Sequence, residues 1–123
     1  GLISGHWSND RTADKQDFRT HSPRFQGDNL THNLGLADKL GELANTYGIS
    51  TAQLVIAWVL TRGEDIVPLV GSRTRARLAE ALGALEATLS NDELTVIEQA
   101  VPADAAAGDR YNAHGMASLD SER

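Results

Sequence analysis

The sequence predicts an α/β chain with one β-strand and about four helices. Apolar residues recur at spacings of three and four, the period of an amphipathic helix, on both sides of one short apolar run at residues 65–70. That run contains β-branched residues and suits a strand covered on both faces, as in a parallel sheet, with Pro68 at an edge or irregularity. Because one strand cannot satisfy its own backbone hydrogen bonds, we expect partner strands from outside these 123 residues.

The first 29 residues are predicted to form a long irregular loop. They are rich in polar residues and show no sustained period of 2 or 3.6. A loop of this length is uncommon in a compact domain unless it is functional or disordered. Its aromatic residues Trp7, Phe18 and Phe25 indicate that it packs onto something, because wholly disordered segments are usually poor in aromatics.

Two helices are expected after this loop. Apolar residues recur at helical spacing through residues 36–47, and Gly48 is a typical residue just past a helix end. Ser50 and Gln53 then have the spacing of a capping box, which predicts the start of a second helix. That helix is apolar over more than half of its circumference as far as Leu60, so we expect it to be largely buried.

Two further helices are expected after the strand. Residues 74–85 have leucines and alanines on one face, which predicts a helix. Ser90 and Glu93 form a second capping-box pair and open a last helix, which Pro102 ends. The tail, residues 103–123, is small, polar and aperiodic and predicts no regular element.

Composition excludes several classes of protein. Without cysteine, neither a disulfide scaffold nor a cysteine-ligated metal is possible, and the four histidines lack the spacing of metal ligands. A net charge of −6 makes nucleic acid and anionic membranes unexpected partners. No apolar run approaches the roughly 18 residues of a membrane span, and no signal-peptide pattern is present, so we expect a cytoplasmic protein.

The most chemically suggestive segment follows the expected strand. Three of the eleven basic residues fall within five positions, and no acidic residue occurs between positions 66 and 79. Gly71 lets backbone approach a ligand, Ser72 offers a hydroxyl, and a helix begins where its free amides favour an anion. Arg73 and Arg77 are four residues apart and could grip a phosphate together. The alternative interpretation is a solvated basic face on a surface helix.

The order of the segments resembles the C-terminal part of the aldo-keto reductases, from after strand seven to the C-terminus. These are NAD(P)H-dependent carbonyl reductases built on a (β/α)8 TIM barrel. The matching segments run nearly end to end: residues 1–5 (GLISG), 18–19, 23–25, 47–54, 57–60, 66–73, 77–80, 82–85, 89–90 and 108–111.

The resemblance implies an organisation for the whole chain. Residues 1–123 would be one C-terminal segment of the reductase domain, with residues 1–29 covering the cofactor, residues 30–101 supplying helices and strand eight, and residues 102–123 forming the tail. Tyr111 in the tail would border the substrate mouth. The remaining barrel strands would come from an N-terminal part of a longer protein or from another chain.

The resemblance also implies NADP as cofactor. Arg73 and Arg77 would bind the adenosine 2′-phosphate beside Gly71 and Ser72, while Glu80 would approach the adenine amine. Gly1, Leu2 and Ser4 would lie beside the pyrophosphate and contribute mainly backbone amides. Relatives commonly have Asn at the position of Ala81, so one adenine contact is in doubt.

The implied activity is the NADPH-dependent reduction of an aldehyde or ketone, the carbonyl substrate, to an alcohol. The family's catalytic tetrad of Asp, Tyr, Lys and His comes from the first half of the barrel, and nothing here matches those positions. We therefore expect no catalytic residue and no metal ligand in this chain, which alone should be inactive. The alternative is a non-catalytic short chain that oligomerises and binds NADP or another phosphate ligand. A third possibility is a truncated chain that oligomerises and has no ligand.

Overall fold

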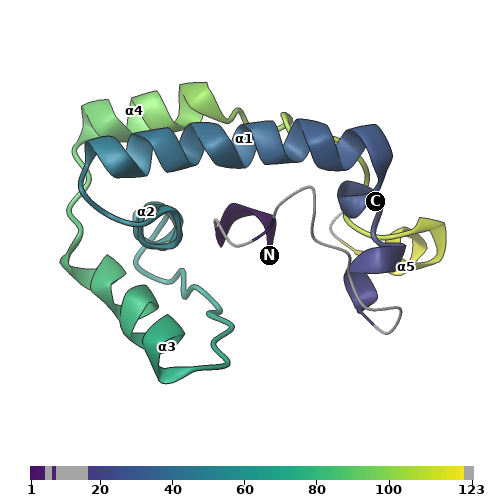
Figure 1. The fold of residues 1–123 in the computed structure, drawn as a ribbon, viewed down its shortest axis with the longest axis horizontal. Helices are drawn as coiled ribbons and strands as arrows, with labels where there is room; N and C mark the ends of the chain where they lie inside the picture. The colour runs from purple at the N-terminus through teal and green to yellow at the C-terminus, as the bar shows by residue number, and fades with distance from the viewer. Residues whose placement is uncertain (5–6, 8–16, 121–123) are drawn as a thin grey trace.

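The structure is a computed structural model that describes residues 1–4, 7 and 17–120. Helix α1 runs along one edge with α4 beside it, α2 lies across α1, and α3 forms a separate arm (Figure 1). Three short 3₁₀ turns precede α1 in the chain, and a fourth follows α3. In chain order the elements are η1 (Leu2–Ser4), η2 (Phe18–His21), η3 (Pro23–Phe25), α1 (Gly27–Thr46), α2 (Thr51–Leu60), α3 (Arg75–Leu82), η4 (Gly83–Glu86), α4 (Asn91–Ala100) and α5 (Ala113–Ala117).

Both predicted capping boxes are confirmed. The hydroxyl of Ser50 accepts from the amide of Gln53 at 3.2 Å, and the amide of Ser50 donates to the Gln53 side chain at 2.9 Å. Ser90 and Glu93 make the same reciprocal pair at the start of α4. Each box satisfies amides that a helix start otherwise leaves without partners.

One helix starts earlier than predicted, and one helix was not predicted. Helix α1 begins at Gly27, inside the segment that was expected to be loop, and continues for 20 residues. The tail contains α5, whose first turn is capped by the Asn112 side chain accepting from the amide of Gly115 at 3.0 Å. The sequence pattern did not predict α5, because this short helix buries no residue and therefore needs no periodic apolar face.

The core lies where α1, α2 and α4 meet. Its buried residues are Leu40 and Ala44 from α1, Leu54 from α2 and Ile97 from α4. The expectation that α2 would be largely buried was wrong in extent: only Leu54 and Ala57 are buried. The rest of α2 is half-buried because its other face lines an open cavity.

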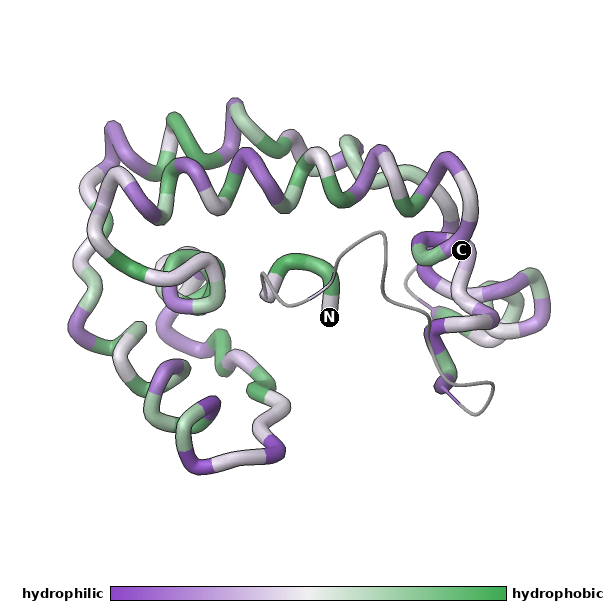
Figure 2. Tube along the Cα trace, in the orientation of Figure 1, coloured by the Kyte–Doolittle hydropathy of each residue, from purple (hydrophilic) through white to green (hydrophobic). Residues whose placement is uncertain are grey.

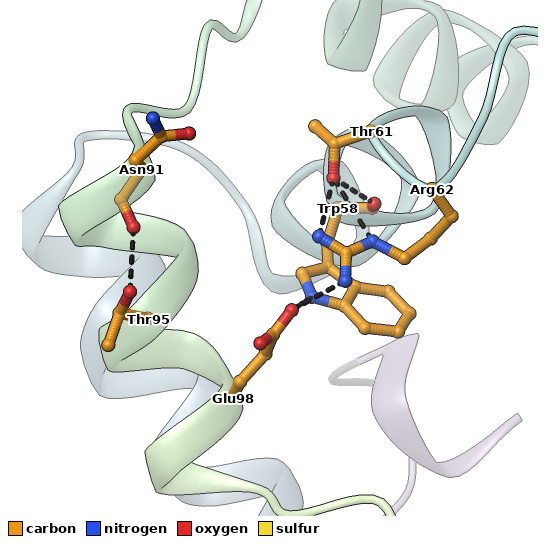
Figure 3. A network of polar contacts seen from close by, with 6 residues as sticks. All are labelled: Trp58, Thr61, Arg62, Asn91, Thr95 and Glu98. Carbon is orange, nitrogen blue, oxygen red and sulfur yellow. Dashed lines mark hydrogen bonds and ion pairs between the residues drawn. The ribbon is translucent and has the colours of Figure 1, made fainter.

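A polar network at the surface joins α2 to α4 (Figure 3). Glu98 accepts from Arg62 Nη1 at 2.6 Å and from Trp58 Nε1 at 3.3 Å, through the same oxygen. The guanidinium carbon of Arg62 lies 4.6 Å from the centre of the Trp58 ring, a cation–π contact. Trp58 therefore packs against the core with its body and keeps its polar edge at the surface.

The predicted strand is not formed. Residues 66–70 have no regular structure, and no strand occurs anywhere in the described part of the chain. Figure 2 shows hydrophobic residues in this connection between α2 and α3, and there Val67 is 78% and Leu69 99% exposed. The physical reason is that a strand needs a neighbour for its backbone hydrogen bonds, and these residues offer none. The described chain is thus helical rather than α/β.

The aromatic residues of the N-terminal segment pack as expected. Trp7 is buried and meets the edge of Phe25 with the ring centres 5.1 Å apart. Phe18 is exposed but lies edge-on to Tyr111 of the tail, at 6.3 Å. The second contact holds η2 against the C-terminal tail.

Within the described ranges, no single helix is long and apolar enough to cross a membrane. Helices α1 and α2 satisfy such a test only when taken together, by length and composition, and they are bent by 89°. The same residues contain no cluster of three or more His, Asp or Glu side chains that could hold a metal ion.

Candidate functional site

An open cavity of about 640 Å³ lies between η1, α2, the connection 67–73 and α3. Its size falls within the range of roughly 300–1,000 Å³ that small-molecule sites usually occupy. Apolar side chains of α2 and the connection form one part of the lining, and charged and backbone groups form another. The lining residues are Gly1, Ile3, Ser4, Trp7, Arg19, Ala52, Val55, Ile56, Val59, Val67, Pro68, Leu69, Val70, Gly71, Ser72, Arg73, Arg77, Glu80 and Ala81.

The cavity gathers residues that are far apart in the sequence. Of the eight predicted cofactor-binding residues, all except Leu2 line it: Gly1, Ser4, Gly71, Ser72, Arg73, Arg77 and Glu80. Leu2 belongs to η1 but is not part of the lining. The structure thus brings the two predicted groups of residues together, and their role as ligands stays a prediction.

The start of α3 is built locally. Thr74 has extended backbone angles and its hydroxyl accepts from the amide of Arg77 at 3.2 Å, so it caps the helix. This cap places Arg73 just before the helix and Arg77 in its first turn. The positive end of the helix dipole adds to the charge of both arginines, which favours an anion at this end of the cavity.

The two cavity arginines at the start of α3 differ in their partners. Nη1 of Arg77 lies 3.5 Å from Oε2 of Glu80, and these side chains are 42% and 26% exposed. Arg73 makes no ion pair with any described residue. Arg75, on the same helix turn, does not line the cavity. Of the three arginines that line the cavity, Arg73 is therefore the most available to an incoming anion.

Among the lining residues that the prediction did not name are an aromatic ring and a cation, Trp7 and Arg19. The Arg19 guanidinium carbon lies 4.5 Å from the centre of the Trp7 ring, and its Nε donates to both oxygens of Asp17, at 2.8 and 3.0 Å. This hydrogen bonding raises the pKa of Arg19 further above its usual value, so the side chain stays charged. Spacing could not reveal either residue, because their segment has no period, and the only signal was the aromatic content of the loop.

The lining combines cations with an apolar wall. Val55, Ile56 and Val59 are half-buried residues of α2 that line the cavity, and Val67 and Leu69 line it from the connection. Such a combination suits a ligand with a flat apolar part and an anionic part.

The comparisons with known proteins agree on one family. A sequence model described as "Aldo/keto reductase family" matches residues 2–102. The chain is 36% identical over 111 residues to "Probable aldo-keto reductase 1" of Glycine max, covering 90% of this chain and 32% of that protein. It is 33% identical over 111 residues to "Aldo-keto reductase yakc [NADP(+)]" of Schizosaccharomyces pombe, covering 90% and 33%.

The chain spans about one third of the length of these curated relatives. The family match covers the capped helices, the connection and the arginine segment, and it ends at Pro102, where α4 has finished. The resemblance drawn from the segment order is thereby confirmed. The chain belongs to the aldo/keto reductase family.

Proposed function

We propose that this chain is the C-terminal, cofactor-binding part of an NADPH-dependent aldo-keto reductase that reduces aldehydes or ketones to alcohols. The observation that carries the proposal is the cavity that gathers Arg73, Arg77 and the N-terminal turn η1 in a member of this family. The relative from Schizosaccharomyces pombe carries NADP(+) in its name, which supports the choice of cofactor.

The chemistry of the cavity lining supports a dinucleotide as the ligand. Arg73 and Arg77 at the start of α3 would hold the 2′-phosphate, with Gly71 and Ser72 close by. Glu80 would approach the adenine amine and also keeps Arg77 turned along the helix through their 3.5 Å ion pair. When bound, NADPH supplies a hydride from its nicotinamide.

The N-terminal turn would serve the pyrophosphate. The hydroxyl of Ser4 donates to the carbonyl of Gly1 at 2.7 Å, which keeps η1 tightly folded beside the cavity. Gly1 and Ser4 line the cavity directly, whereas Leu2 would contribute only through its place in the turn. Arg19 also lines the cavity and would add a further cation for the same ligand.

The proposed reductase needs more than this chain. Its barrel would be completed by strands from the rest of a longer protein or from a second copy, and its catalytic tetrad would come from there. This chain alone should then be inactive toward a carbonyl substrate. The exposed apolar side chains of Val67 and Leu69 support such a completion, because a covered strand would bury them. A cytoplasmic location belongs to the same proposal.

Titration of the full chain with NADPH and with NADH tests the 2′-phosphate assignment. A charge-assisted hydrogen bond contributes about 1.5–3 kcal/mol, and exposure of the arginines reduces this, so Arg73→Ala should weaken NADPH binding by about tenfold. Binding of NADH, which lacks the phosphate, should change little. Arg77→Ala should weaken NADPH binding less than Arg73→Ala, because the Arg77 guanidinium already forms an ion pair with Glu80.

Arg75→Ala is the matched control. It removes the same charge from the same helix turn, but its side chain does not line the cavity. An equal loss of NADPH affinity in both variants would mean that general charge, not a site, attracts the cofactor. Binding of neither cofactor, together with self-association in sedimentation, would favour the purely structural alternative.

A further inference from the structure

Asn33 joins α1 to the turn that precedes it and to the tail, 74 residues further along the chain. It lies on α1, is only 5% exposed, and donates through Nδ2 to the carbonyls of Arg24 at 3.1 Å and Ala107 at 2.9 Å. Its Oδ1 accepts from the amide of Ala107 at 2.8 Å. A buried amide with three such partners holds its neighbours in one arrangement, because any movement leaves a buried polar group without a partner.

Further contacts strengthen the same junction. Nε of Arg24 donates to the carbonyl of Gly108 at 3.1 Å, and Nδ2 of Asn29 donates to the carbonyl of Pro23 at 3.2 Å. Figure 1 shows the C-terminal α5 beside the turns that lead into the start of α1. We call Asn33, Arg24 and residues 107–108 the tail clamp.

The tail clamp holds a segment that reaches the cavity. Arg24 follows η2, which carries the cavity residue Arg19, and it precedes Phe25. Phe25 packs on the cavity residue Trp7, on which Arg19 also lies, with 5.1 Å between the ring centres and 4.5 Å from the guanidinium carbon. The wall formed by Arg19 and Trp7 is therefore connected to the clamp through Phe25 and through the turn that carries Arg24.

We infer that Asn33 is a positioning residue, through which the C-terminal tail fixes the Arg19 and Trp7 wall of the cavity. Tyr111 of the tail also supports the wall, because its ring meets that of Phe18 at the start of η2 with 6.3 Å between the ring centres. The effect on NADPH binding rests on the proposed function. The effect on the wall itself does not.

The first test measures the solvent exposure of the wall residue Trp7 with no ligand present. Trp7 and Trp58 are the two tryptophans of the chain, so in a Trp58→Phe background Trp7 alone reports by fluorescence. Asn33→Asp keeps the acceptor for Ala107 and loses both donated hydrogen bonds. Loss of these bonds should open the wall locally and raise acrylamide quenching of Trp7 by about twofold.

Two further variants distinguish a specific effect on the wall from a general loss of stability. Tyr111→Ala changes an exposed side chain, so the fold should survive and quenching should again rise. Ile97→Val is the control, because it lowers stability from the core without touching the clamp, and it should leave quenching unchanged. Unchanged quenching in both Asn33→Asp and Tyr111→Ala would overturn the inference, as would an equal rise in Ile97→Val.

The second test follows the cofactor. In stopped-flow displacement, Asn33→Asp should release NADPH about fivefold faster, since weaker wall contacts appear mainly in the dissociation rate. Release at the unchanged rate from a variant with raised Trp7 quenching would refute the effect on the cofactor. If the unmodified chain binds no NADPH, the proposed function fails, while the quenching result still decides the role of Asn33.

Discussion

Replacing Gly108 by alanine tests how tightly the tail lies against the N-terminal segment. Gly108 has φ +82°, where an alanine is disfavoured by about 1 kcal/mol. A Cβ would also lie 2.7 Å from Asn29 Nδ2 and 3.1 and 3.2 Å from the carbonyl carbon and oxygen of Pro23. Asn29 can turn away, but Pro23 is backbone, and overpacking of this kind costs about 1–3 kcal/mol. The expected loss of unfolding free energy is therefore about 2–4 kcal/mol.

Gly48→Ala separates the two contributions. Gly48 ends α1 with φ +70°, and nothing lies within 4 Å of the added Cβ, so only the conformational cost of about 1 kcal/mol should appear. Urea denaturation followed by circular dichroism measures both losses, at two protein concentrations because self-association would shift the midpoint. Equal losses for the two variants would refute the argument that the tail presses on Pro23.

Three further predictions concern the core, the last long helix and the open connection. Leu54→Ala should cost about 2–5 kcal/mol in urea denaturation because Leu54 is fully buried; under 1 kcal/mol would mean the core is loosely packed. The amide and hydroxyl of Ser90 donate to the Glu93 carboxylate and hold its pKa below the ordinary 4.5. The ionised carboxylate therefore stabilises the start of α4 fully above pH 4.5, and this stabilisation is lost as pH falls through the lowered pKa. Glu93→Gln should reduce the loss of helicity with falling pH. Leu69→Lys should leave the fold of this chain unchanged and abolish any self-association seen by sedimentation; persistent association would place the contact elsewhere.

Local signals explain which helices could be predicted. A capping box needs only residues three apart in sequence, so Ser50 with Gln53 and Ser90 with Glu93 marked their helices correctly. The strand could not be judged in the same way, because its existence depends on neighbours in space. Residues 66–70 have the composition of a strand and lie exposed where no neighbour is present.

The candidate site shows the same difference between local signals and contacts in space. Arg73 and Arg77 could be predicted because a run of positive charge next to Gly71 is visible within nine residues of an acidic chain. Arg19 and Trp7 could not, because their place on the cavity follows from packing on Phe25 and from the tail clamp. Long-range contacts of this kind leave no period in the sequence.

The exposed connection and the candidate cofactor site are physically one structure. Residues 67–70 form an irregular wall of the cavity and lead directly into Gly71, Ser72 and Arg73. Pairing this connection with neighbouring strands would restrict its backbone and therefore the position of Arg73. A cation held in place binds an anion with less loss of conformational entropy than a mobile one. Completion of the barrel should then strengthen cofactor binding by fixing Arg73, in addition to any contact that the added part makes to the cofactor.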